Sequence, residues 1–268
     1  MVAGRSGSRV RFTLTLGLLL LALGAPGCGS RGGDRATRPV LRIAAASDLQ
    51  TVLPVLIERF GGSEPGVEVV PVIGSSGQLA RQIEAGAPFD LFLSANRDFV
   101  DKLAATKAVD PASVKPYAIG TLVLAVGRDV KAPVEKLSDL TRQEIKVVAI
   151  ADPETAPYGA AARQALRKAG LWEALGPKLA IASTVRQALQ YVETGNAEAG
   201  LVSRSIADVP GVRLVAVDPA SYEPIVQSLG VVGRTVHRRE AGAFAQFILG
   251  AEGRGVLRAH GFTLPGGP

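Results

Sequence analysis

Residues that usually carry metal or redox chemistry are scarce in this chain. Its 268 residues include one cysteine, two histidines, one tryptophan and one methionine. A single cysteine excludes a disulfide framework and any cysteine-based metal site. His237 and His260 stand apart in the sequence and lack the spacing of metal ligands. We therefore expect no directly bound metal ion and no cofactor, and we interpret both histidines as surface or packing residues.

Motifs of common catalytic sites are lacking as well. The segment Gly74–Gly77 (GSSG) matches neither the G-x-S-x-G turn of serine hydrolases nor the G-x-x-x-x-G-K-[ST] phosphate loop. A hydrolase with Ser47 or Ser76 as its nucleophile would need a general base, and neither histidine is a plausible one. Asp152 and Glu154 fit a turn and a first helical turn better than a catalytic pair. We expect no enzymatic activity.

Positive charge is in excess only near the N-terminus. The formal net charge of the whole chain is +6, but residues 1–38 hold six arginines and one aspartate. The remaining 230 residues therefore carry 24 basic and 23 acidic side chains. Proteins that bind nucleic acid rely on a concentrated basic surface. This nearly neutral body gives no reason to expect a nucleic-acid partner.

The first 28 residues have the pattern of an export signal. A basic region with three arginines precedes the apolar run Phe12–Leu23, which is too short to span a bilayer comfortably. Cys28 follows Ala-Pro-Gly, which resembles a bacterial lipobox with alanine where leucine is usual. We predict a signal peptide over 1–28, a lipid anchor on Cys28 and a flexible tether over 29–38. The alternative is an ordinary secretory signal peptide with an incidental cysteine.

Strand-like and helical patterns alternate over the rest of the chain. The apolar, β-branched runs that predict strands are Val40–Ala46, Val67–Val72, Asp90–Leu93, Ile119–Val126, Lys146–Ile150, Ala199–Ser203, Val212–Val217 and Val226–Val232. Apolar positions three and four residues apart predict helices around 49–60, 162–169, 185–192 and 244–251. This alternation indicates an α/β fold with doubly wound sheets, in which ligands bind at the carboxyl ends of the strands.

Four predicted helix starts carry residues suited to anion binding. They are Ser47–Leu49, Ser75–Gly77, Ala156–Gly159 and Ser183–Gln187. The first amides of a helix have no intrahelical acceptor, and the helix dipole favours negative charge there. Taken singly, each serine or threonine is most simply an N-cap, and Thr184 with Gln187 fits a capping box. If the four starts converge, they predict an oxyanion site made without lysine or arginine.

Several segments resemble one protein family. The most specific is Ser75–Ala95 (SSGQLARQIEAGAPFDLFLSA), and Ala44–Ser47 (AAAS) precedes it. Further similarity lies in Ala151–Gly159 (ADPETAPYG), Ser183–Leu189 (STVRQAL) and Arg258–Phe262 (RAHGF). Together these segments resemble the periplasmic molybdate-binding proteins of bacterial ABC transporters, over nearly all of the chain after Pro39.

The resemblance implies a two-lobed fold of the type II periplasmic binding proteins, with mostly parallel sheets flanked by helices and a ligand cleft between the lobes. Lobe 1 is expected to comprise 39–118 plus 226–268, and lobe 2 to comprise 119–225. The residues implied to contact the oxyanion are Ser47, Ser76, Tyr158, Val185 and Ser203. Tyr158 and Val185 would contribute backbone amides. Some family members have a tyrosine where this chain has Ser203. We expect Ser203 to line the cleft but, because its side chain is shorter, to contribute less to binding than Ser47 or Ser76.

Asp48 is a second departure from the family pattern. We interpret it as a first-turn acid that interacts favourably with its own helix dipole. The alternative is a carboxyl directed into the cleft, where it would repel a dianion or accept a proton from a protonated anion. A site of neutral donors alone predicts an affinity that is nearly independent of pH between about 6 and 8.

The function implied by the resemblance is capture of molybdate, and of tungstate, for an ABC importer. The protein would be an exported monomer in the periplasm or on the cell surface, anchored to a membrane through Cys28 and acting on a permease. The rival functions are binding of sulfate, thiosulfate or phosphate, a serine hydrolase, and the ligand-sensing effector domain of a transcription regulator. The export signal and the lack of an N-terminal DNA-binding domain argue against the last.

Overall fold

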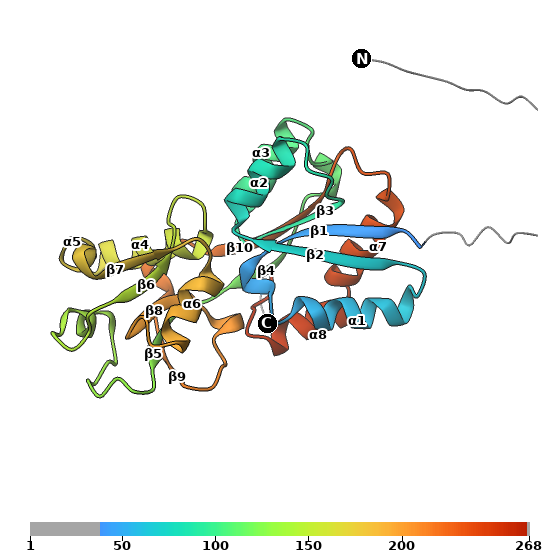
Figure 1. The fold of residues 1–268 in the computed structure, drawn as a ribbon. Coiled ribbons are helices and arrows are strands. Elements are labelled where there is room, and N and C mark those ends of the chain that lie inside the picture. Colours follow the sequence, from blue (N-terminus) through green and yellow to red (C-terminus); the bar gives the residue numbers. More distant parts are fainter. Residues whose placement is uncertain (1–37, 267–268) are drawn as a thin grey trace, which may run out of the picture. The chain divides into compact units, whose positions relative to one another are not determined.

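The computed structural model describes residues 38–266. The predicted signal peptide, Cys28 and all but the last residue of the predicted tether lie outside the described residues. The described chain contains two five-stranded mixed sheets flanked by helices (Figure 1). None of the helices in this part of the chain is both long and apolar enough to cross a membrane.

The first sheet has the strand order β2-β1-β3-β10-β4. Its strands are β1 (Val40–Ala46), β2 (Glu68–Gly74), β3 (Leu91–Ser94), β4 (Lys115–Gly120) and β10 (Ile225–Val231). The accompanying helices are α1 (Leu53–Ser63), α2 (Ser76–Glu84), α3 (Arg97–Ala105), α7 (Arg238–Leu249) and α8 (Ala251–Ala259), with short 3-10 helices η1 (Ser47–Leu49) and η2 (Pro111–Ser113). Strand β10 runs antiparallel to both of its neighbours, while β1 is parallel to β2 and β3.

The second sheet has the order β7-β6-β8-β5-β9. Its strands are β5 (Leu122–Gly127), β6 (Val148–Ala151), β7 (Leu179–Ala182), β8 (Ala199–Ser203) and β9 (Val212–Ala216). Around it lie α4 (Pro157–Lys168), α5 (Trp172–Leu175) and α6 (Val185–Glu193), with η3 (Leu137–Thr141), η4 (Gly176–Lys178), η5 (Arg204–Ile206) and η6 (Pro219–Ser221). Here β5 is the strand that runs antiparallel to its neighbours.

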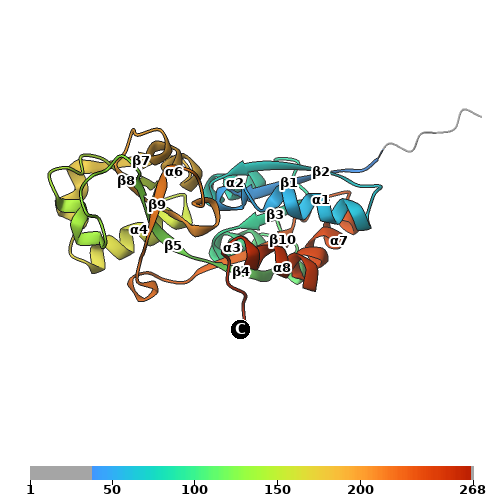
Figure 2. The ribbon, with the colours of Figure 1, turned by 90° about the horizontal axis from the view of Figure 1, so that it is seen from below.

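The chain passes between the sheets twice, from β4 to β5 and from β9 to β10 (Figure 2). We call the first sheet and its helices lobe 1 (38–120 and 225–266) and the second sheet and its helices lobe 2 (121–224). The predicted boundary after residue 118 would fall inside β4. A single predicted strand over Ile119–Val126 is two strands in the structure, because the chain leaves lobe 1 at Thr121. The amide of Leu122 is bonded there to the Tyr222 hydroxyl, at 3.1 Å.

Alternating side chains of β1 explain how lobe 1 is layered. Leu41, Ile43 and Ala45 are fully buried in a core shared with α1, α7 and α8. Ala44 points to the other face, into a second core shared with α2 and α3. Figure 1 shows these two helical groups on opposite faces of the sheet. Successive strand residues face opposite sides, so burial on both faces requires an almost continuous apolar run, which VLRIAAA supplies.

Most predicted elements are found, but several observed ones, among them β7, α3 and α5, were not predicted. Strands β1 and β8 match their predicted ranges residue for residue. Strand β7 was not predicted; it is an edge strand of only four apolar residues (LAIA), too short for periodicity to distinguish it from part of a helix. The helix predicted around 244–251 is α7, which ends at Leu249. Ala251, at the end of the predicted range, is the first residue of the next helix, α8.

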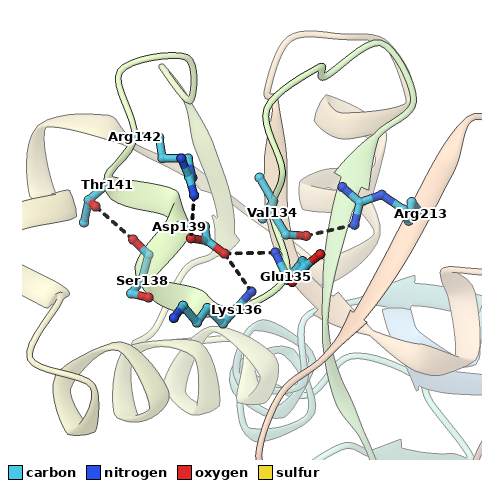
Figure 3. A network of polar contacts seen from close by, with 8 residues as sticks. All are labelled: Val134, Glu135, Lys136, Ser138, Asp139, Thr141, Arg142 and Arg213. Carbon is cyan, nitrogen blue, oxygen red and sulfur yellow. Dashed lines mark hydrogen bonds and ion pairs between the residues drawn. The ribbon is translucent and has the colours of Figure 1, made fainter.

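Polar contacts also secure the irregular segment of lobe 2 before η3 (Figure 3). Asp139 accepts hydrogen bonds from the amides of Glu135 and Lys136, at 3.0 and 3.2 Å. The bond from the Glu135 amide is the largest of several causes that hold the pKa of Asp139 below its usual value. Arg213 of β9 donates to the carbonyl of Val134 at 2.8 Å. This network fixes a loop of lobe 2, and none of its residues lines the cavity described next.

Candidate functional site

Four helix starts, two from each lobe, surround one small, nearly closed cavity, in which the centre of a water molecule has about 10 Å³ to move. The residues that line it are Ala46, Ser47, Asp48, Gly74, Ser75, Ser76, Ala95, Ala156, Pro157, Tyr158 and Val185. No lysine, arginine or histidine is among them. The structure therefore brings together Ser47, Ser76, Tyr158 and Val185, four of the five predicted site residues.

Strand pairing explains why these starts meet. In lobe 1, β1 and β2 are parallel and Ala46 pairs with Gly74, so the residues that follow both strands emerge side by side. Lobe 2 repeats this arrangement, because β6 and β7 are parallel and Ala151 pairs with Ala182. The chain then continues into α4 and α6. Carboxyl ends of adjacent parallel strands form a common edge, which is where α/β proteins bind ligands.

In lobe 1, Ser76 is the first residue of α2 and Ser75 is its N-cap. Both are buried, with 0% and 2% of their surface exposed. The Ser76 hydroxyl accepts a hydrogen bond from the amide of Ala95 at 2.9 Å, which leaves its own proton free to be donated. The Ser75 hydroxyl makes no cap bond and has no partner among the described residues. Prediction from sequence had passed over Ser75 as a contact.

In lobe 2, Tyr158 and Val185 contribute helix-start amides. Tyr158 is the second residue of α4, and Val185 is the first residue of α6. Thr184 is the N-cap of α6 and accepts from the Gln187 amide at 3.1 Å, as predicted. The Gln187 side chain returns to Ser183 rather than to Thr184. Because Thr184 Oγ1 serves the Gln187 amide, the amide of Val185 is left as a donor at the cavity.

Hydrogen bonds join the two lobes around the cavity. The amide of Gly77 in α2 donates to the carbonyl of Thr155, just before α4, at 2.9 Å. A Cβ atom at Gly77 would stand 2.9 Å from that same carbonyl oxygen, so this approach requires glycine. On another side, the Ser205 hydroxyl of η5 donates to the Asp48 carbonyl at 2.7 Å.

Ser203 is not among the lining residues, which corrects the expectation that it lines the cleft. It is fully buried as the N-cap of η5. Its hydroxyl lies 2.8 Å from that of Ser205 and accepts from the Ser205 amide at 3.3 Å. The short side chain turns to cap the next element, so it does not reach the cavity.

Asp48 is also unlike the first-turn acid that was predicted. Only 1% of it is exposed, and its carboxyl Oδ2 accepts from the Gln227 side chain of β10. Burial away from water raises its pKa from 3.8 to about 6, although hydrogen bonds from Tyr158 and Gln227 oppose this rise. The carboxyl lies in a polar cluster behind the cavity instead of facing solvent at a helix end.

Unsatisfied polar atoms are concentrated at this cavity. Among the described residues, four buried side-chain oxygens have no hydrogen-bond partner: Asp48 Oδ1, Ser75 Oγ, Tyr158 Oη and Ser228 Oγ. Three of the four belong to residues that line the cavity. Buried polar groups are nearly always paired in folded proteins, so these unpaired atoms set the cavity apart from the rest of the described interior.

Comparison with known proteins places the chain in a family. The model of the family described as bacterial extracellular solute-binding protein matches residues 41–263. The chain belongs to this family. The match covers both lobes and all four helix starts of the cavity.

Individual relatives of this solute-binding protein cover nearly the whole chain. ModA of Escherichia coli, a molybdate-binding protein, is 34% identical over 241 residues, which are 87% of this chain and 92% of ModA. A Bacillus subtilis protein named as an ABC transporter substrate-binding lipoprotein, YvgL, is 32% identical over 94% of this chain and 98% of its own. The structure of the periplasmic molybdate-binding protein of Azotobacter vinelandii superposes with a TM-score of 0.78 at 30% identity, covering 84% of this chain and 99% of that one.

The histidines and the acidic pair of this solute-binding protein lie elsewhere. His237 precedes α7, and the ring of His260 contacts the carbonyl of Val256 at 2.8 Å. Asp152 accepts from the amide of Glu154 and so closes a turn, as predicted. Within residues 38–266, no three or more histidine, cysteine, aspartate or glutamate side chains gather as they would around a metal ion.

Proposed function

We propose that this solute-binding protein captures molybdate, and also tungstate, and delivers the anion to an ABC importer. The observation that carries the proposal is the cavity itself: helix starts from both lobes, serine hydroxyls, and no basic side chain. Such a set can donate hydrogen bonds to an oxyanion from several directions at once.

Desolvation explains why such a site suits a dianion. A tetrahedral dianion loses its hydration shell on binding, which is costly unless fixed donors replace the water molecules. The first amides of α2, α4 and α6 are fixed by the backbone and lack intrahelical acceptors. The hydroxyl protons of Ser75 and Ser76 are not used by protein acceptors. Donors that cannot accept a proton favour an anion that carries none.

Similarity to named proteins supports the choice of molybdate and the transport role. ModA of Escherichia coli and the Azotobacter protein are molybdate-binding proteins, and YvgL is named as a lipoprotein of an ABC transporter. By analogy, this protein would act outside the cytoplasm as a monomer, held to a membrane by a lipid on Cys28. Its protein partner would be a permease, and it would carry out no reaction of its own.

Selectivity among oxyanions would follow from size and protonation. Sulfate is a tetrahedral dianion like molybdate, so the volume of the closed cavity must separate the two. Phosphate and its relatives carry a proton near neutral pH and need an acceptor. Asp48 is the carboxyl among the residues that line the cavity, and it could accept that proton. Phosphate is therefore the main alternative ligand to test.

A thermal-shift panel tests the proposed function. The full chain is heated with molybdate, tungstate, sulfate, thiosulfate or phosphate as sodium salts. A ligand specific to the folded state stabilises it by about 2.7 kcal/mol at a hundredfold excess over its Kd. We expect molybdate and tungstate to raise the melting temperature and the other anions to leave it unchanged. Greater stabilisation by sulfate or phosphate would overturn the assignment.

The lipid anchor is tested separately. Wild-type protein expressed in a bacterial host should sediment with membranes, and a Cys28→Ala variant should not, because it lacks the thiol that carries the lipid. Equal distribution of both proteins between soluble and membrane fractions would support an ordinary secretory signal instead.

A further inference from the structure

The polar cluster behind the cavity contains residues that the proposed oxyanion site does not use. Asp48 Oδ2 accepts from Gln227 Nε2, and Gln227 Oε1 accepts from the Tyr117 hydroxyl at 3.0 Å. Asp48, Tyr117 and Gln227 all belong to lobe 1, on η1, β4 and β10. All are buried, with at most 2% of their surface exposed. Within lobe 1 these three side chains form a linear series of hydrogen bonds, from the Tyr117 hydroxyl through the Gln227 amide to the Asp48 carboxyl.

One side chain of this cluster comes from lobe 2. Tyr158 of α4 is 1% exposed, and its hydroxyl lies over Gly120, where a Cβ atom would overlap it. The hydroxyl is close enough to the Asp48 carboxyl for each group to alter the pKa of the other. The aromatic side chain of Tyr158 is therefore held by lobe 1, whereas its backbone stands at the start of α4 in lobe 2.

Two complementary atoms meet at this junction without a bond of normal geometry. Asp48 Oδ1 and Tyr158 Oη are both buried, and neither makes a hydrogen bond of normal geometry among the described residues, although the Tyr158 hydroxyl lies within reach of Asp48 and Ser203. A carboxylate oxygen accepts hydrogen bonds, and a phenol donates one. Leaving both atoms unpaired in the interior is unfavourable, whereas pairing them satisfies both.

We propose that Tyr158 is a positioning residue, whose hydroxyl pairs with Asp48 Oδ1 across the two lobes and thereby holds the start of α4 against the bound oxyanion. The proposal rests on the proposed oxyanion function and adds a role for a side chain to the one already given to the Tyr158 amide. The pair works with Asp48 ionised, when the phenol donates, and with Asp48 protonated, when either group can donate.

The charge of Asp48 gives the proposal a signature that packing alone would not give. The groups that face its carboxyl are Tyr117 of β4, Gln227 of β10 and Tyr158 of α4, while Ser205 of η5 donates to its backbone carbonyl. None of these is basic, so an ionised Asp48 repels a dianion in the cavity. Affinity should then fall as the pH rises past the pKa of Asp48. Since the Tyr158 hydroxyl lowers that pKa, its removal should move the midpoint upward.

Titration calorimetry with sodium molybdate between pH 5.5 and 8.5 tests the pair in the full chain. Tyr158→Phe keeps the ring and the amide and removes only the hydroxyl. We expect it to weaken binding at least tenfold at pH 5.5, where Asp48 is mainly protonated in both proteins. In an Asp48→Ala background, which removes the acceptor and should also abolish the pH dependence, the same change should cost less than threefold. The matched control is Tyr117→Phe, which removes a buried hydroxyl of the same cluster within lobe 1 and should stay within threefold of wild type.

Two outcomes would overturn the positioning role: equal losses in Tyr158→Phe and Tyr117→Phe, or an undiminished loss in the Asp48→Ala background. A second readout needs no anion. The carboxyl carbon of Asp48, followed by NMR against pH, should show a higher midpoint in Tyr158→Phe and an unchanged one in Tyr117→Phe. If wild type binds no molybdate, the proposed function fails, and this titration still decides whether the hydroxyl acts on Asp48.

Discussion

Replacing Ser76 by alanine should lower both affinity and stability, and the structure separates the two effects. Its hydroxyl accepts from the buried amide of Ala95 and faces the cavity with its proton. Leaving that amide unpaired should cost about 1–3 kcal/mol of unfolding free energy. Losing a hydrogen bond to a charged ligand should cost a further 1.5–3 kcal/mol of binding, or roughly ten- to 150-fold in Kd. Urea unfolding without anion and calorimetry with molybdate measure these separately.

Ser113→Ala is the matched control for Ser76→Ala. Its hydroxyl accepts from the amide of Val231 at 2.8 Å, so it makes the same kind of bond to a backbone amide. It does not line the cavity. The control should lose stability and keep its affinity. If Ser76→Ala behaves in the same way as the control, its hydroxyl is not a ligand donor and the reasoning from the cavity is refuted.

Three further substitutions test other parts of the account. Ser203→Ala should change the Kd for molybdate by less than threefold and lower stability by about 1 kcal/mol, because its hydroxyl caps η5 away from the cavity. A tenfold loss of affinity in calorimetry would contradict this. Gly159→Ala places a Cβ against the carbonyl of Ala151. It should therefore lower the free energy of unfolding in urea by about 1–3 kcal/mol and weaken binding by displacing the start of α4. Unchanged affinity would show that the start of α4 does not contact the anion. Burial raises the pKa of Asp48 from 3.8 to about 6, so wild type loses stability as the pH rises through this interval. Asp48→Asn lacks that loss and should be more stable than wild type by up to about 3 kcal/mol at pH 8 and by less than about 1 kcal/mol at pH 4, and an equal difference at both values would contradict the burial of its charge.

Local sequence patterns were sufficient to predict the alternating architecture and most of the site. The run VLRIAAA predicts β1 because both of its faces are apolar, and the serines that follow β1 and β2 predict helix starts. That these starts converge follows from parallel pairing, with Ala46 opposite Gly74. Pairing over such a distance in sequence leaves no local signal, so convergence was supplied by the family resemblance.

Long-range contacts explain what sequence missed. The role of Asp48 depends on Gln227, 179 residues away, and on Tyr158, and neither partner is visible in the pattern around Asp48. Ser203 was expected at the cavity because a homologous position carries a longer side chain. Its own short hydroxyl bonds to Ser205 two residues later. In both cases the outcome depended on side-chain length and on competing partners, which a motif does not record.

A crystal structure with bound molybdate tests the central claim most directly, since the anomalous signal of molybdenum locates the anion without ambiguity. We predict one anion in the cavity between the lobes, with its oxygens within about 3 Å of the Ser47 and Ser76 hydroxyls and of the Tyr158 and Val185 amides. No basic side chain should contact it. An anion located elsewhere, or one held by lysine or arginine, would contradict the account.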